Sequence, residues 1–316
     1  MRKIIISLII LCFISEGFAR EMKVLMIGNS FSICVGKNLP QIVKMSNKHH
    51  LQLTSAFIGG CSLETHAKHL KQAEKDPSHK PYYIDNWNSA DLRRKKTYKG
   101  NVLELLKNNK YDVITIQQAS HFSWNYATYQ PHADIVIDYI RKFNPQAKIM
   151  VQQTWAYRSD DSRLRVKKGS WGFDQNGMHE RVRAAYHKFA NEKGFEIIPV
   201  GDAISIYRKS TPSYKVLSSK ELAGYQNPDL PPMANDIVGR DFWKKQKDGT
   251  MKLEADRIHL NFKGEYLQAC VWYITLFGEN SATIHYEHPN ISREECLKLA
   301  SAAGQACNII VKPSGN

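Results

Sequence analysis

The chain has 316 residues, and its 44 Lys and Arg residues outnumber its 30 Asp and Glu residues, which gives a formal net charge of +14 at neutral pH. This length is enough for one large α/β domain or two small ones, and the charge favours polyanionic partners. The sequence contains no Cys-x-x-Cys pair and no Cys/His spacing typical of zinc ligands, so neither a structural zinc protein nor a metal or cofactor site is expected.

The N-terminus has the pattern of a signal peptide. Arg2 and Lys3 precede an apolar stretch over residues 4–14, and small residues at 17–19 form a cleavage site. The stretch is shorter than the about 20 residues of a membrane span, although a retained N-terminal anchor is the alternative. We expect residues 1–19 to be removed, and the mature chain to be periplasmic or secreted. Stable membrane insertion and a nucleic-acid partner are not expected.

Strand-like apolar runs alternate with helical patterns along the rest of the chain. Residues 112–116 are almost continuously apolar or β-branched, as in a central buried strand. This alternation predicts a mainly parallel sheet with helices on both faces. The expected strands are residues 23–28, 52–58, 111–117, 148–154 and 196–200, and the expected helices are residues 37–47, 99–108, 129–143, 177–193 and 262–276.

The mature chain is expected to form one domain over residues 20–285, since no repeat or low-complexity linker divides it. Residues 286–316 are expected to be a C-terminal helix and tail packed on the same domain. The sequence SREE at residues 292–295 is a capping box that opens this helix, and the helix is expected to end near Gly304.

Three long segments follow strand ends, at residues 62–100, 155–178 and 203–255. They carry most of the excess positive charge, with dense basic clusters at residues 91–99 and 163–168. Ligands of open α/β sheets bind at the carboxyl ends of the strands, so these segments predict an anionic ligand held by arginine side chains. The expected substrate contacts are Trp155, Arg158 and Arg163. Stacking on sugar rings and packing in the core are both open for Trp124, Trp155, Tyr157 and Trp171.

Two distant motifs carry the chemistry. In KVLMIGNSFS, residues 23–32, a strand ends at Gly28 and places Ser30 on the following turn, as a nucleophile or as a helix N-cap. In EADRIHLNF, residues 254–262, Asp256 and His259 stand three residues apart before a helix. Because both motifs are expected at the same edge of a parallel sheet, they predict a nucleophile, its general base and an orienting carboxylate.

These two motifs resemble the first and last sequence blocks of the SGNH (GDSL-type) hydrolases, and residues 256–273 are also similar to a block of exported carbohydrate-esterase-like members. The resemblance implies a three-layer α/β/α flavodoxin-like fold of about five parallel strands. It also implies ester hydrolysis through an acyl-enzyme without a cofactor, with Ser30 as nucleophile, His259 as base and acid, and Asp256 as its partner.

The middle blocks of the family match less closely. The second block implies an oxyanion-hole N–H from the glycine pair before Cys61, and Gly60 fits this place better than Gly59. The third block usually supplies an Asn side chain, where this chain has Gln117 and Gln118. Either amide is a candidate to complete the oxyanion hole.

The sequence therefore predicts an exported serine esterase that removes an O-acetyl or methyl ester from an acidic, pectin-like polysaccharide. The alternatives are a non-catalytic glycan-binding protein that retains the fold, and a lipase or thioesterase. Oligomeric state is left open. The disulfide pairing is also left open, and a bridge between Cys34 and Cys61 is one candidate. The mature chain has five cysteines: Cys34, Cys61, Cys270, Cys296 and Cys307.

Overall fold

The computed structural model describes residues 19–92, 94, 95, 97–164, 170–212, 215–232 and 236–311. Residues 1–18 of the expected signal peptide lie outside this part, as do residues 93, 96 and 165–168 of the two basic clusters.

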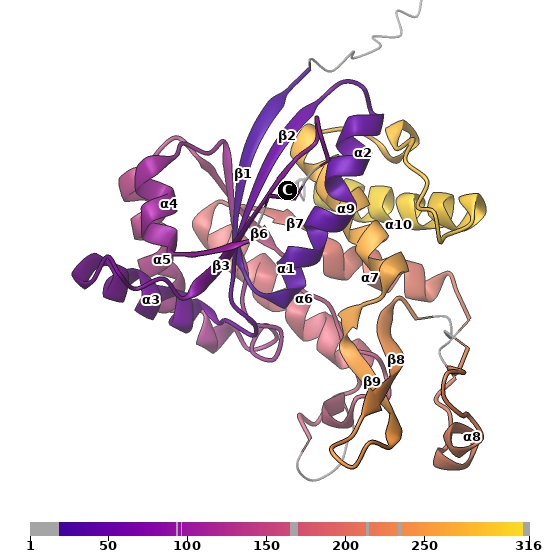
Figure 1. Ribbon diagram of the computed structural model, residues 1–316. Helices are drawn as coiled ribbons and strands as arrows, with labels where there is room; N and C mark the ends of the chain where they lie inside the picture. The colour runs from indigo at the N-terminus through magenta and orange to yellow at the C-terminus, as the bar shows by residue number, and fades with distance from the viewer. Residues whose placement is uncertain are drawn as a thin grey trace, which may run out of the picture.

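A seven-stranded sheet runs through the centre of the molecule in the order β4-β3-β2-β1-β5-β6-β7 (Figure 1). The strands are β1 (Glu21–Gly28), β2 (His50–Phe57), β3 (Tyr82–Asn88), β4 (Tyr98–Gly100), β5 (Val113–Ile116), β6 (Lys148–Gln152) and β7 (Glu196–Ile198). Five of them, in the order β2-β1-β5-β6-β7, are parallel, whereas β3 and β4 are antiparallel at one edge. This parallel order is the flavodoxin-like one, so the expected fold class is confirmed.

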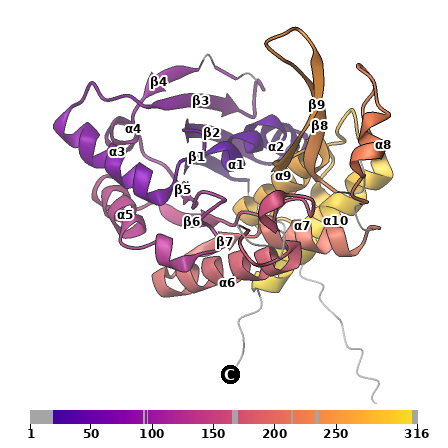
Figure 2. The ribbon, with the colours of Figure 1, turned by 90° about the horizontal axis from the view of Figure 1, so that it is seen from below.

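Helices cover both faces of the sheet (Figure 2). The helices α3, α4 and α5 contact one another on one face, and α2, α7, α9 and α10 form a second group on the other. The bounds are α1 (Ser30–Ile33), α2 (Leu39–Met45), α3 (Leu63–Lys75), α4 (Val102–Asn108), α5 (His132–Phe143), α6 (Gln175–Lys193), α7 (Val200–Lys209), α8 (Ser219–Ala223), α9 (Phe262–Phe277) and α10 (Arg293–Val311).

The helix that follows the second motif, α9, is buried along most of its length. A helix that is apolar on nearly all sides must pack against other elements on every side. Helices α10 and α7 pack against α9 in addition to the sheet. The expected end of the last helix near Gly304 is wrong, because this glycine lies inside α10. An added Cβ there would come within 3.0 Å of Ser281 Oγ, so Gly304 permits close packing and does not end the helix.

Two of the three long segments that follow strand ends contain strands that the sequence did not predict. Segment 62–100 contains β3 and β4, and segment 203–255 contributes most of a hairpin made by β8 (Val238–Lys245) and β9 (Met251–Leu260). The hairpin extends beyond the carboxyl ends of the parallel strands (Figure 1). In the described part of the chain, no helix has the length and apolarity needed to cross a membrane.

Candidate active site

Strand β1 places Ser30 at the carboxyl edge of the sheet. Gly28 ends the strand, and a Cβ on it would lie only 2.2 Å from Ser32 Oγ, so a larger residue would displace the Ser32 side chain. Asn29 is the N-cap of α1, and its Oδ1 accepts a hydrogen bond from the Phe31 N–H at 3.0 Å. Ser30 is therefore the first residue of the helix. The alternative that Ser30 is itself the N-cap is wrong, and its hydroxyl is left for another partner.

That partner is His259, at the end of β9. His259 Nε2 lies 2.8 Å from Ser30 Oγ, and His259 Nδ1 lies 2.8 Å from Asp256 Oδ2. The pairing of β8 with β9 is irregular at Gly239, where φ is +95° and an added Cβ would lie 2.9 Å from the Asp256 carbonyl oxygen. From Val238 to Arg240 the register advances two positions on β8 but four on β9, so the extra residues lie on β9 between Asp256 and Leu260. His259, in this segment, meets Ser30 although the two are 229 positions apart in the sequence.

The electrostatics of Asp256 suit an orienting carboxylate. Burial disfavours its charged form, but a hydrogen bond from His259 and the backbone N–H groups of Ile258 and His259 outweigh burial and hold the pKa of Asp256 well below its ordinary value. An ionised Asp256 keeps the imidazole proton on Nδ1. The Nε2 lone pair is then directed at the Ser30 hydroxyl, which is the arrangement needed to take its proton.

The loop before Cys61 lies next to the nucleophile turn. Asn29 Nδ2 donates to the Cys61 carbonyl oxygen at 2.9 Å, which ties the loop to the turn. Gly60 has a φ of +63°, a conformation that favours glycine. Among the described residues, the N–H groups of Ser30 and Gly60 donate to no backbone or side-chain acceptor, so both are free to bind an oxyanion.

Gln118 does not face this site. Its Nε2 donates to the Thr128 carbonyl oxygen at 2.9 Å, and its Oε1 accepts from the backbone N–H groups of Leu63 and Ala119. These bonds use the whole amide to hold two loops together. The Gln118 amide is therefore not available to complete the predicted oxyanion hole.

Gln117 does reach the nucleophile turn, but through Asn29. Its Nε2 donates to Asn29 Oδ1 at 2.6 Å, and its Oε1 accepts from Gln152 Nε2 at 2.5 Å. The side chain is almost fully buried. Gln117 thus fixes the residue that caps α1 and holds the Cys61 loop.

A buried polar network continues behind the nucleophile, and the sequence did not predict it. The Phe31 carbonyl oxygen accepts from Gln152 Nε2 at 2.9 Å and from Gln268 Nε2 at 2.8 Å, while Gln152 Oε1 accepts from Trp272 Nε1 at 2.8 Å. Such networks rigidify a site when every group is satisfied. Two glutamines in buried elements were the available signal: Gln152 ends the apolar run of β6, and Gln268 interrupts the buried helix α9.

The predicted substrate contact at Trp155 is wrong. The indole is fully buried and stacks on the Phe31 ring, with centroids 4.1 Å apart, and its Nε1–H donates to the Ile258 carbonyl oxygen at 2.9 Å. It therefore packs between the sequence neighbours of Ser30 and His259, where no sugar can reach it.

Arg158 is also not a substrate contact. It is 4% exposed, and its guanidinium pairs with Asp160 at 2.7 Å and with Asp241 of β8 at 3.4 Å. Asp160 in turn pairs with Arg257, between Asp256 and His259 in sequence, at 2.8 Å. This ion-pair cluster anchors the hairpin to the sheet edge instead of binding a ligand.

Arg163 remains at the surface. Its side chain is 37% exposed, pairs with Asp161 at 2.7 Å, and lies over the rings of Tyr157 and Trp171. Tyr157 is buried and therefore packs in the core and does not stack on a sugar, whereas Trp171 is half-buried. The structure therefore leaves Arg163 and Trp171 as surface residues of this segment.

The described cysteines form no disulfide, so the candidate bridge between Cys34 and Cys61 is wrong. Cys34 Sγ contacts Gln268 Oε1 at 2.9 Å, and burial raises the pKa of both thiols to about 12. Both are small buried residues of the core. All five described cysteines are buried and unbridged: Cys34, Cys61, Cys270, Cys296 and Cys307.

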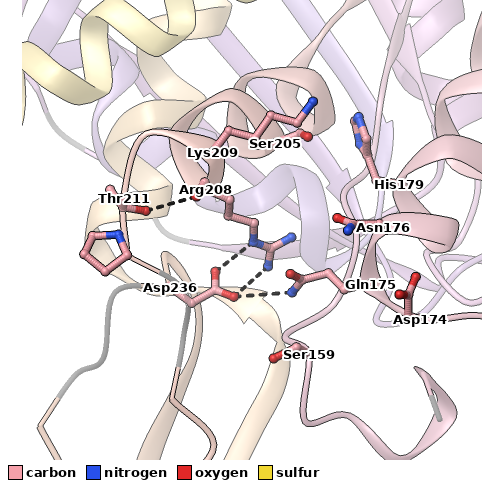
Figure 3. Close-up of a pocket in the computed structure, with 11 residues that line it drawn as sticks. Ser159, Asp174, Gln175, Asn176, His179, Ser205, Arg208, Lys209, Thr211 and Asp236 are labelled. Carbon is pink, nitrogen blue, oxygen red and sulfur yellow. Dashed lines mark hydrogen bonds and ion pairs between the residues drawn. The ribbon is translucent and has the colours of Figure 1, made fainter.

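A polar cavity of about 460 Å³ lies close to the second motif (Figure 3). Asp236 lines the cavity, and its carboxylate pairs with Arg208 at 3.0 Å. The Asp236 carbonyl oxygen accepts a hydrogen bond from the side chain of Asn261, the N-cap of α9. Burial lowers the pKa of His179 at the opposite wall. Arg208 and Asp236 neutralise each other, and their ion pair holds the residues just before β8 against α7.

Comparisons with known proteins place the chain in a family. A family model described as "Domain of unknown function (DUF4886)" matches residues 23–221, which include Ser30 and Gln117 but end before Asp256. A search of curated proteins found no match.

Solved structures with similar folds come from bacteria and a fungus. A DUF4886 family protein from Bacteroides uniformis is 25% identical with a TM-score of 0.72, covering 93% of this chain and 97% of that one. A putative GDSL-like lipase from Parabacteroides merdae is 12% identical with a TM-score of 0.46, covering 83% and 97% of the two chains. A carbohydrate esterase family 3 protein from Talaromyces cellulolyticus is 13% identical with a TM-score of 0.43, covering 81% and 97%. Because the family model spans more than half of the sequence, the chain belongs to the DUF4886 family.

Proposed function

We propose that this protein is an exported serine esterase of the SGNH type that removes an O-acetyl or methyl ester from an acidic polysaccharide. The observation that carries the reaction class is the pair of 2.8 Å contacts joining Ser30 Oγ, His259 and Asp256 at the carboxyl edge of the sheet. The resemblance of the sequence to exported SGNH hydrolases and the basic loops of this edge support export and an acidic substrate.

The first half of the reaction forms an acyl-enzyme. Ser30 Oγ attacks the ester carbonyl carbon while His259 Nε2 takes the hydroxyl proton, and Asp256 stabilises the imidazolium that results. The N–H groups of Ser30 and Gly60 bind the oxyanion of the tetrahedral intermediate. His259 then returns the proton to the leaving alcohol oxygen.

The second half hydrolyses this acyl-enzyme. Water loses a proton to His259 and attacks the acyl carbon, and Ser30 leaves with that proton. For an O-acetyl ester, Ser30 carries acetate and a sugar hydroxyl leaves first. For a methyl ester, Ser30 carries the uronate and methanol leaves first.

An active-site label tests the proposal. A fluorophosphonate is expected to label the wild-type protein at Ser30, and Ser30→Ala and His259→Ala are expected to abolish the labelling. Assays of acetate and methanol released from acetylated and methylated pectins then identify the ester. A wild-type protein that stays unlabelled while a control esterase reacts would favour the non-catalytic glycan-binding alternative.

A further inference from the structure

The β8–β9 hairpin joins the candidate active site to an arm beyond the sheet. Strand β9 carries Asp256 and His259 near its end, and the rest of the hairpin extends past the carboxyl edge (Figure 1). Directly paired residues of an antiparallel hairpin project from the same face. Arg240 pairs with Asp256 in the register of the two strands, so it leaves the hairpin on the same face as the carboxylate that holds His259.

Side chains alternate between two faces along this hairpin. The residues on the Asp256 face, here called the site face, are Arg240, Phe242, Lys244, Lys252, Glu254 and Asp256, and those on the opposite face are Asp241, Trp243, Lys245, Met251, Leu253 and Ala255.

The opposite face is the one that packs against the protein. Asp241 pairs with the buried Arg158, and Trp243 Nε1 donates to the Asp229 carbonyl oxygen at 2.9 Å. Leu253 lies at a cavity shared with the segment around α8. The hairpin is therefore held from this side.

The site face is less covered, although Glu254 lines the same cavity as Leu253. Phe242 is 36% exposed, and Arg240 and Lys252 are exposed. Both carboxylates of the face are already used, since Glu254 pairs with Lys244 at 3.1 Å and Asp256 holds His259. Within the described part of the chain, no ion pair neutralises Arg240 or Lys252.

An exposed aromatic ring between two unneutralised cations, on the same hairpin face as Asp256, fits a chain of acidic sugars. The apolar face of a pyranose packs on an aromatic ring, and a guanidinium binds a carboxylate through two parallel hydrogen bonds. We propose that the site face binds a polyuronate chain leading away from the ester at Ser30, with Phe242 against a sugar ring and Arg240 and Lys252 on its carboxylates. This inference rests on the proposed function, whose substrate it specifies.

Binding is best measured without turnover, in the full-length Ser30→Ala protein, with unesterified oligogalacturonate as the probe. Arg240→Gln and Lys252→Gln together are expected to weaken binding about 10-fold or more, because each removes a charge-assisted contact. Lys245→Gln is the matched control. It removes the same charge from the same hairpin but on the opposite face, and it is expected to change the affinity less than about twofold, as a screened surface charge should.

Three results would overturn the inference. They are no binding of oligogalacturonate, equal weakening by Lys245→Gln, and equally tight binding of a neutral oligosaccharide or of duplex DNA. Phe242→Ala adds a readout that charge alone does not move, since it should weaken binding while leaving the salt dependence unchanged.

A parallel assay separates this inference from the reaction class. If the wild-type protein hydrolyses p-nitrophenyl acetate but Ser30→Ala protein does not bind oligogalacturonate, the binding inference alone is wrong. If oligogalacturonate binds at the site face but no ester is cleaved and no label attaches, the proposed function is wrong and the binding face stands.

Discussion

The indole of Trp155 lies parallel to the ring of Phe31, with the two centroids 4.1 Å apart and 9° between the planes. Phe31 follows Ser30 in sequence, and its ring also meets His259 edge-on, with centroids 5.6 Å apart. The Trp155 N–H holds the Ile258 carbonyl oxygen, one residue before His259. One buried side chain from the loop after β6 therefore sets the distance between the two halves of the candidate catalytic pair.

Trp155→Leu should lower kcat about 10- to 100-fold with little change in KM, since small displacements of reacting groups have costs of this size. Trp155→Phe, which keeps the stack and loses only the hydrogen bond, should recover part of the loss. The measurement is a kcat and KM comparison on a small ester, with thermal unfolding recorded for every variant.

The control for Trp155 is another buried aromatic residue that donates to one backbone carbonyl. Tyr266 does so, with its hydroxyl 2.7 Å from the Tyr286 oxygen. Tyr266→Phe should lower stability and leave kcat unchanged. A loss of kcat in Tyr266→Phe equal to that in Trp155→Phe would assign both effects to general destabilisation.

The two adjacent glutamines make a second test. Gln117→Leu removes one hydrogen bond from Asn29 Oδ1 and one from the Gln152 amide, each of which keeps a bond to the Phe31 backbone, and the net loss of a buried hydrogen bond costs about 0.5–1.5 kcal/mol. We expect kcat to fall at least about 10-fold, because Asn29 caps the helix that starts at Ser30. Gln118→Leu should lower the free energy of unfolding with little change in kcat, because its bonds run to Thr128, Leu63 and Ala119. The reverse order of the two kcat effects would return Gln118 to the oxyanion hole.

Much of the architecture could be predicted from the sequence because it depends on local pattern. Continuous apolar strands alternating with amphipathic helices determine a parallel sheet, and strand ends then share one edge. Strand β1 brings Ser30 to that edge as expected. Asp256 and His259 lie on β9 of a separate antiparallel hairpin, so their meeting with Ser30 could be predicted from the two motifs and their order but not from the parallel sheet.

The errors share a different cause. Whether Trp155 and Arg158 face a ligand or the core depends on partners far away in the sequence. These are Phe31 and Ile258 for Trp155, and Asp241 for Arg158. Charge and aromaticity alone do not reveal such partners. The hairpin was missed because its solvent-facing residues are mainly charged, and exposed strands have little of the apolar signal on which strand prediction relies.

The carboxylate of the proposed triad is a third test. Asp256→Asn keeps the size of the side chain but removes the charge that fixes the His259 proton on Nδ1. In a serine hydrolase triad, this change costs about 10⁴ in kcat, and we expect a loss of that order here. Fluorophosphonate labelling should slow in parallel, whereas KM for a small ester should change little. A loss of less than tenfold would mean that His259 is oriented by other groups and that the proposed role of Asp256 is wrong.

Acid sensitivity of the fold should arise at a histidine outside the site. His66 on α3 is fully buried, its Nδ1 contacts Tyr82 Oη at 2.9 Å, and among the described residues its Nε2 has no partner. Burial, helped by nearby His69, lowers the pKa of His66 from 6.5 to about 3. The unfolded chain therefore binds a proton between these pH values that the folded chain does not.

The sign follows from this difference in bound protons. The contribution of His66 to stability is complete above pH 6.5 and is lost progressively as the pH falls from there toward 3. The free energy of unfolding should thus drop by up to about 1.4 kcal/mol per pH unit from this group. Urea unfolding at pH 7, 6 and 5 measures the slope. His66→Gln, which can still bond to Tyr82, should flatten the slope, whereas the same substitution at the exposed His285 should keep the acid sensitivity of the parent protein. An unchanged slope in His66→Gln would show that the acid response comes from other groups.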